Sequence, residues 1–222
     1  MVNRIKEQYF DSKSIAEKSR IMLQKVEKYR ERHKITPNPE HCALLIIDMQ
    51  RYFLDDDSHA YIPSSPPVIE NIKKLSDAFC KIGAQIILTK HSNTHDNANL
   101  MSIWWGELIN DNNPLSEIIP ELHIPGVTVI KKTQYDAFYK TNLEDFLKEK
   151  EITQIVVTGV MTHLCCETTA RSAFMRGFTV FFPVDGTASY NEEFHQSTIL
   201  NLSHGFAIPV LCRELIGYRE GI

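Results

Sequence analysis

Residues 154–178 read QIVVTGVMTHLCCETTARSAFMRGF and contain a strand, a turn and a helix in close succession. The β-branched apolar run at 155–158 predicts a strand buried on both faces. The segment 167–176 is followed by Gly177, a common helix stop, and predicts a helix. A buried strand that leads into a helix is typical of βαβ units, in which a helical crossover joins parallel strands.

The same alternation continues on both sides of this stretch. Further short apolar runs lie at 43–47, 85–89, 127–130, 179–182 and 207–210, and helical patterns lie between them, for instance at 66–81 and 141–150. Six strands with helical connectors predict a three-layer α/β fold, in which a six-stranded parallel sheet is flanked by helices. The long connectors 51–65 and 91–113 exceed ordinary loop lengths and are candidates for lids or pocket walls.

Ahead of the first strand, apolar positions recur at helical spacing over 15–33, and Pro37 and Pro39 follow. This pattern predicts an amphipathic helix that packs on its own domain or on a partner subunit. We therefore expect an N-terminal helical arm, 1–39, followed by one α/β domain, 40–222.

Composition narrows the class of protein. The 222 residues carry a formal net charge of -4 and no long basic stripe, which argues against nucleic acid as a partner. No apolar run approaches the roughly 18 residues of a membrane span, and the first residues do not resemble a secretory signal. Five scattered cysteines without CxxC spacing favour reduced thiols, although a strained Cys165–Cys166 disulfide is conceivable. We expect a cytoplasmic protein.

Three polar groups follow predicted strands: Asp48 after ALLII, Lys132 after VTVI, and Cys165 in the turn after QIVVT. The carboxyl ends of parallel strands meet at one edge of the sheet, where ligands bind. There Asp48 can transfer a proton, Lys132 can stabilise negative charge, and Cys165 is a candidate nucleophile whose pKa a helix N-terminus lowers. Each also has a plainer interpretation: a turn cap, a solvated lysine, or an inert thiol such as we expect for Cys166.

Four segments together resemble the isochorismatase-like cysteine hydrolase superfamily over about 42–211. They are ALLIIDMQRYF, KKTQYDAFYKTNLEDFL, VVTGVMTHLCCETTARSAFMRGF and VDGTAS. The resemblance implies a six-stranded parallel sheet and a catalytic set of Asp48, Lys132 and Cys165. It also implies a cis peptide between Val160 and Met161, and an oxyanion hole formed by the amides of Met161 and Cys165. Residues 40–222 then form the isochorismatase-like hydrolase domain.

The reaction type stays open between two branches of this superfamily. The leading hypothesis is hydrolysis of a small amide or ureide through a Cys165 thioester. The flanks SIWWGEL, YDAF and TTARSAFMRGF are closer to the isochorismatase branch, which cleaves a vinyl ether and typically carries glycine where Cys165 stands. The alternatives are therefore ether hydrolysis by Asp48 and Lys132 without the cysteine, or a non-catalytic binding or assembly module. The resemblance also implies a homo-oligomer, a dimer or tetramer, acting on a small-molecule substrate.

The resemblance bears on metal binding and on the substrate pocket as well. Nicotinamidases of the superfamily bind a divalent ion through a D-x-H pair, but here His91 and Asn93 occupy those places, so we expect no metal and no cofactor. A different site formed by His91, His95 and Asp96 remains open. Six side chains are candidate substrate contacts, with core packing as the alternative for the aromatic ones. They are Phe53, His91, Trp104, Tyr135, Phe138 and His163.

Overall fold

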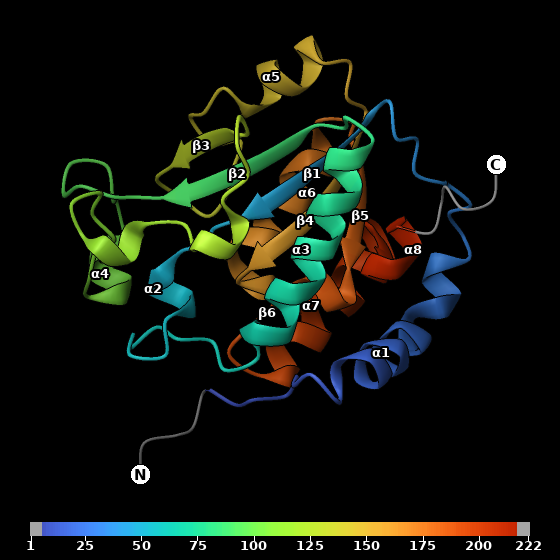
Figure 1. Ribbon diagram of the computed structural model, residues 1–222, viewed down its shortest axis with the longest axis horizontal. Coiled ribbons are helices and arrows are strands. Elements are labelled where there is room, and N and C mark those ends of the chain that lie inside the picture. The colour runs from blue at the N-terminus through green and yellow to red at the C-terminus, as the bar shows by residue number, and fades with distance from the viewer. Residues whose placement is uncertain (1–5, 217–222) are drawn as a thin grey trace.

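The computed structural model describes residues 6–216, in which seven parallel strands form a single sheet (Figure 1). Six strands follow the spatial order β3-β2-β1-β4-β5-β7, and the short β6 pairs with β4. The strands are β1 Cys42–Ile47, β2 Ile86–His91, β3 Thr128–Lys132, β4 Gln154–Val160, β5 Thr179–Pro183, β6 Thr187–Ala188 and β7 Ile208–Val210. The six predicted strands are confirmed, whereas β6 was missed because two residues carry no detectable periodicity.

Helices cover both faces of this sheet. In Figure 1, α3 crosses in front of the sheet, while α6 and α7 lie behind it. The α-helices are α1 Ile15–Arg30, α2 Arg51–Leu54, α3 Ser65–Lys81, α4 Met101–Trp105, α5 Leu143–Glu149, α6 Glu167–Met175, α7 Glu192–Gly205 and α8 Cys212–Ile216. The described part of the chain also has three 3₁₀ turns, η1 Pro114–Ser116, η2 Pro120–Leu122 and η4 Val184–Gly186, and a π-helical turn, η3 Thr162–Cys166. The three-layer α/β prediction is confirmed.

Burial follows the position of each strand in the sheet. All residues of β1 and β2 are buried, as expected for strands with a neighbour on each side and helices on both faces. The edge strand β3 instead alternates, so that Ile130 and Lys132 face the protein while Val129 and Lys131 face solvent. This alternation decides which of two consecutive lysines reaches the interior.

The strand order creates a crevice beside β1. The chain runs outward from β1 through β2 to the edge strand β3, then returns to β4 on the other side of β1 and continues to β5 and β7. Because crossovers of parallel strands are right-handed, this reversal places α3 and α6 on opposite faces. Loops diverge at such a switch point, and a ligand site is expected at the carboxyl ends of β1 and β4.

The N-terminal arm packs on the domain of its own chain. Helix α1 contacts α7 and β7, and its Ile15, Met22 and Val26 belong to the same hydrophobic core as the sheet. The helix ends at Arg30 rather than at residue 33, because the next amides make tighter i→i+3 bonds and His33 is exposed. Within residues 6–216, no helix is both long and apolar enough to cross a membrane.

Candidate active site

Asp48 lies directly after β1 and is completely buried. Its backbone adopts a left-handed conformation, with φ of 49°, which is rare for a residue with a side chain and turns the chain sharply at the strand end. Thr89 of β2 fixes the carboxylate, since its hydroxyl donates to Oδ1 at 2.6 Å and accepts from the Asp48 amide at 3.0 Å. Asp48 is therefore held in a single orientation.

Gly159 brings the end of β4 against β1 at this point. Its φ of +108° favours glycine, and a Cβ atom here would lie 2.1 Å from the carbonyl oxygen of Ile47. Only glycine allows the two backbones to approach this closely. The close approach places the turn that follows β4 next to Asp48.

Lys132 joins the other groups into one cluster. Its Nζ lies 2.6 Å from Oδ2 of Asp48, and it donates to the Cys165 thiol sulfur at 3.3 Å and to the Gln134 carbonyl at 2.9 Å. Burial lowers the pKa of Lys132, but the charges and hydrogen bonds of Asp48 and Cys165 outweigh burial and leave the pKa raised. An ammonium is thus held against the carboxylate and the thiol, while Lys131 pairs with Asp111 at the surface.

Cys165 lies in the π-helical turn η3, between β4 and α6. Burial raises the pKa of its thiol to about 12, an effect that Lys132 opposes only in part. We expected a lowered pKa from the helix N-terminus, but burial raises the pKa of this thiol instead. The resting side chain is a neutral thiol that needs a proton acceptor, and Asp48 is adjacent.

The other cysteines are free thiols. Cys166 is fully buried, and its sulfur lies 3.8 Å from the Thr158 carbonyl. No disulfide joins it to Cys165. Cys166 therefore has the packing role that the sequence suggested for it.

His91, the last residue of β2, forms part of the wall beside Lys132. Its Nε2 lies 2.6 Å from Oδ1 of Asn93, and its Nδ1 lies 3.4 Å from Nζ of Lys132. Burial, reinforced by the Lys132 charge, lowers the pKa of His91 to about 4. The imidazole is therefore neutral at neutral pH.

These side chains do not fit a metal site of the kind seen in nicotinamidases. Both ring nitrogens of His91 face protein groups, and His95 and Asp96 lie exposed on the following loop. Within residues 6–216, no group of three His, Cys, Asp or Glu side chains is placed to hold an ion. The residues at this position therefore do not form the metal site that the D-x-H pair would supply.

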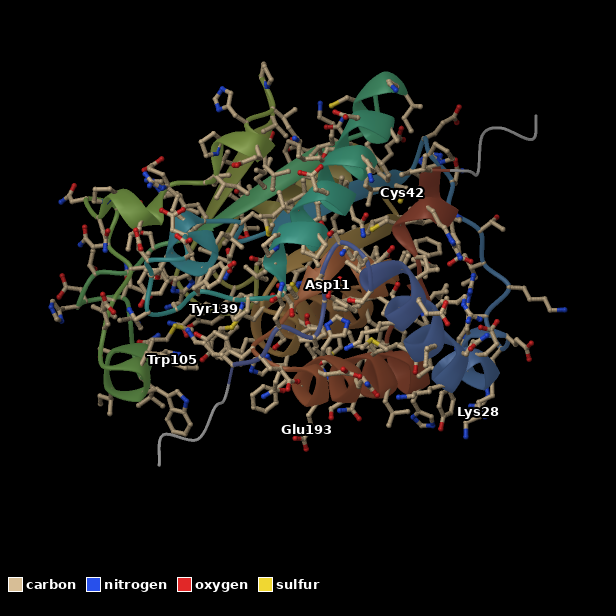
Figure 2. All side chains as sticks on the ribbon, turned by 60° about the horizontal axis from the view of Figure 1, so that its bottom comes forward. Asp11, Lys28, Cys42, Trp105, Tyr139 and Glu193 are labelled. Atoms are coloured by element: carbon tan, nitrogen blue, oxygen red, sulfur yellow. The ribbon has the colours of Figure 1, made fainter. Side chains whose placement is uncertain are left out.

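A cavity opens above Cys165, walled mainly by aromatic and aliphatic side chains from the connectors that follow β1 and β2. The long connectors are thus pocket walls, as the sequence suggested. Figure 2 shows Trp105 of α4, a residue of the cavity wall, far from Cys42, the first residue of β1. The cavity therefore does not lie at the end of the sheet where β1 begins. The lining residues are Tyr52, Phe53, His59, Ala60, His91, Asn93, Met101, Trp105, Glu107, Ile109, Tyr135, Met161, Leu164, Cys165 and Tyr190.

Three of the six predicted substrate contacts, Phe53, His91 and Tyr135, line this cavity. A fourth, Trp104, does not, because 77% of its surface is exposed on the outer side of the short helix α4. Its neighbour Trp105 takes the place at the wall, where its Nε1 donates to the Tyr135 hydroxyl at 2.9 Å. Trp105, and not Trp104, therefore lines the cavity. A helix of five residues is too short for its sequence periodicity to reveal which face points inward.

The remaining two contacts lie elsewhere. Phe138 is buried and stacks on Phe178 with ring centroids 5.9 Å apart, so it packs in the core. His163 turns away from the cavity lining, with Nδ1 2.6 Å from the Ser189 hydroxyl and its ring stacked on Phe194. Adjacent residues on the turn point to different sides of it, which residue type alone does not reveal.

The turn before Cys165 has the backbone that the family resemblance implies. The peptide bond between Val160 and Met161 is cis, and Met161 lines the cavity beside Cys165. The sequence did not single out Thr89, although strand alternation places it on the same side of β2 as His91. The position of Thr89 on the same face of β2 as His91 was the sequence pattern that could have identified it.

The parallel sheet, its crevice and the buried polar cluster define the site of an α/β enzyme, and comparison with known families gives its class. Residues 42–214 match the family model described as Isochorismatase domain. The chain belongs to this family, within the isochorismatase-like cysteine hydrolase superfamily, and is a hydrolase. The alternative of a non-catalytic binding or assembly module, which the sequence had left open, is set aside because the chain is a hydrolase.

Known relatives include both reaction types. The chain is 38% identical to Nicotinamidase 3 of Arabidopsis thaliana over 190 residues, covering 83% of this chain and 92% of that protein. It is 32% identical to the isochorismatase of Bacillus subtilis (strain 168), covering 81% of this chain and 58% of that longer protein. A cysteine hydrolase structure from Pseudomonas syringae pv. phaseolicola 1448A has a TM-score of 0.80 at 22% identity, covering 82% and 94% of the two chains, and supports the fold.

Proposed function

We propose that this protein hydrolyses a small amide or ureide C–N bond through a thioester on Cys165. The observation that carries the proposal is the Cys165 sulfur 3.3 Å from the Lys132 ammonium, which itself lies 2.6 Å from the Asp48 carboxylate. A neutral thiol, an adjacent base and a fixed cation are the parts that nucleophilic acyl transfer needs. The similarity to a nicotinamidase along most of both chains supports the same reaction class.

The proposed reaction has two halves. Asp48 takes the thiol proton as the sulfur attacks the carbonyl carbon, and the amides of Met161 and Cys165 hold the oxyanion. The tetrahedral intermediate then collapses, the C–N bond breaks, and Asp48 returns its proton to the departing amine. In the second half Asp48 removes a proton from water as the water attacks the thioester carbon. The C–S bond then breaks, Asp48 returns this proton to the sulfur, and Cys165 is released as a thiol together with the acid product. Lys132 balances the charge throughout.

The cavity wall favours a neutral, flat substrate. Lysine and arginine are absent from the described residues that line the cavity, and the one carboxylate among them is Glu107. The Tyr52 hydroxyl donates to Glu107 Oε2 at 3.0 Å, which places an acidic, hydrogen-bonded group in the wall. Nicotinamide fits this wall better than isochorismate, because isochorismate carries carboxylates that the wall would repel or leave unpaired.

The test is turnover of nicotinamide, measured as ammonia release, by wild type, Cys165→Ala and Cys80→Ala. Cys80 is exposed, so its variant controls for loss of a thiol as such. We expect Cys165→Ala to lose more than about 10³-fold in kcat and Cys80→Ala to match wild type. Quenched wild-type reactions should show an acyl adduct on the Cys165 peptide by mass spectrometry. Full nicotinamide turnover by Cys165→Ala would contradict the thioester.

Vinyl ether hydrolysis is the second candidate, favoured by the 32% identity to an isochorismatase and by the intact Asp48–Lys132 pair. Isochorismate is therefore assayed beside nicotinamide. Isochorismate turnover that survives in Cys165→Ala, with no amide turnover in wild type, would establish this second function and overturn the first.

We further propose a cytoplasmic homo-oligomer. Leu100, Ile103 and Trp104 expose large apolar side chains on and beside α4, and such a patch is typical of a protein interface. The free thiols of Cys42, Cys80, Cys165, Cys166 and Cys212 suit a reducing compartment. Light scattering coupled to gel filtration gives the number of subunits, and a monomer would refute this part of the proposal.

A further inference from the structure

The segment before α1 runs beside the loops that carry the site (Figure 1). The Glu7 amide donates to the carbonyl of Tyr190, a residue of the cavity wall, at 2.7 Å. The amides of Tyr9 and Phe10 both donate to the buried Ser64 hydroxyl, at 2.8 and 3.0 Å. The N-terminal arm is therefore fixed to two segments that adjoin the cavity.

The Tyr9 side chain reaches from this segment into the protein. It is 3% exposed, and its ring packs against those of Phe10 and His195, at centroid distances of 4.5 and 5.3 Å. Its hydroxyl accepts from the amide of Ser189 at 2.9 Å and also interacts with the Thr162 hydroxyl. A buried polar group with two partners of this kind holds both partners in place.

Thr162 links Tyr9 to the chemistry. It is the first residue of the π-helical turn that contains Cys165, and it follows Met161 directly. Its hydroxyl oxygen lies 2.9 Å from Nδ1 of His195, and both side chains are completely buried. Tyr9 and His195 thus hold this hydroxyl on the side of the turn away from the cavity.

We propose that Tyr9 is a positioning residue, through which the N-terminal arm fixes the Met161–Cys165 turn so that its amides meet the oxyanion of the amide reaction. This inference rests on the proposed function. Removing the Tyr9 hydroxyl leaves the buried Ser189 amide without this acceptor, and Ser189 itself holds the turn through its hydroxyl, 2.6 Å from Nδ1 of His163. The donors then lose alignment where charge develops, while the substrate walls stay in place.

The test is Tyr9→Phe, which keeps the ring, with Tyr29→Phe as the matched control. Tyr29 lies on the same arm and packs edge-on against His204, away from the site. For each variant we measure kcat and KM for nicotinamide, and the rate at which iodoacetamide alkylates Cys165. Alkylation needs the thiol and its base but forms no oxyanion, so it separates alignment of the donors from general loosening of the site.

We expect kcat of Tyr9→Phe to fall by about tenfold, below the roughly 10²–10³-fold loss for deleting an oxyanion donor outright. The KM and the alkylation rate of Tyr9→Phe should stay within about twofold of wild type. For Tyr29→Phe, kcat, KM and the alkylation rate should all stay within the same range. Thr162→Val, which removes the partner hydroxyl, should reproduce the effect and serves if Tyr9→Phe does not fold.

Two results would overturn the inference: an unchanged kcat in Tyr9→Phe, or a parallel loss of kcat and alkylation with a raised KM. Failure of the proposed function is visible separately. In that case wild type would release no ammonia from nicotinamide, or Cys165→Ala would release it as fast as wild type.

Discussion

Replacing Lys132 by methionine tests whether the buried ion pair organises the site. The substitution keeps the length of the side chain but removes the ammonium, which leaves the Asp48 carboxylate buried without its cation. Unit charges 2.6 Å apart attract each other by about 6 kcal/mol at an effective dielectric constant of 20. Desolvation offsets part of this attraction in the intact pair, but breaking a buried pair typically costs about 3–5 kcal/mol, because the remaining charge stays desolvated.

Urea denaturation followed by circular dichroism gives the free energy of unfolding. Lys132→Met should lose about 3–5 kcal/mol, whereas Lys131→Met, which disrupts only an exposed pair with Asp111, should stay close to wild type. The double variant Asp48→Asn, Lys132→Met removes both charges and should recover most of the loss. A Lys132→Met protein as stable as the Lys131→Met control would refute the reasoning.

Three further predictions concern the backbone, the cavity wall and pH. Gly159→Ala should lower the free energy of unfolding by about 3 kcal/mol or more, because the new Cβ atom would collide with a facing backbone carbonyl. The control Gly83→Ala has open space around its Cβ position and a φ of +67°, and should cost only about 1 kcal/mol. Trp105→Ala should raise KM for nicotinamide by about tenfold while Trp104→Ala leaves it unchanged; equal effects would contradict the wall assignment. The pKa of His91 is about 4 in the folded protein and 6.5 ordinarily, so the unfolded chain binds the extra proton and stability falls as pH drops through this window. Thermal melts of His91→Gln should fall less steeply there, and parallel curves would refute this.

The central cluster could be predicted from the sequence because the carboxyl ends of parallel strands meet at one edge of the sheet. Asp48, Lys132 and Cys165 each follow a strong apolar run, and the strand order brings those three ends together. The choice of Lys132 over Lys131 follows from alternation on an edge strand, a pattern the structure makes plain. Here local pattern and global topology agree.

The cavity wall was harder to predict, since its residues come from irregular connectors. Trp104 and Trp105 are adjacent on a five-residue helix, and only packing decides which of them faces inward. The prediction of a lowered pKa for the Cys165 thiol was wrong for a related reason. Burial raises this pKa, and the extent of burial depends on every surrounding segment. Tyr9 shows the limit most clearly: its partners Thr162 and Ser189 are more than 150 positions away along the chain.

The edge position of β3 has a consequence for where the Lys132 ammonium lies. A side chain on a strand changes face with every residue, so a slip of β3 by a single step against β2 would turn Lys132 toward water and bring Lys131 inward. The inward-facing Ile130 and the surface pairing of Lys131 with Asp111 both oppose that slip. An edge strand, with one neighbour instead of two, thus sets where the positive charge lies, and the charge geometry of the cluster depends on the register of β3 against β2.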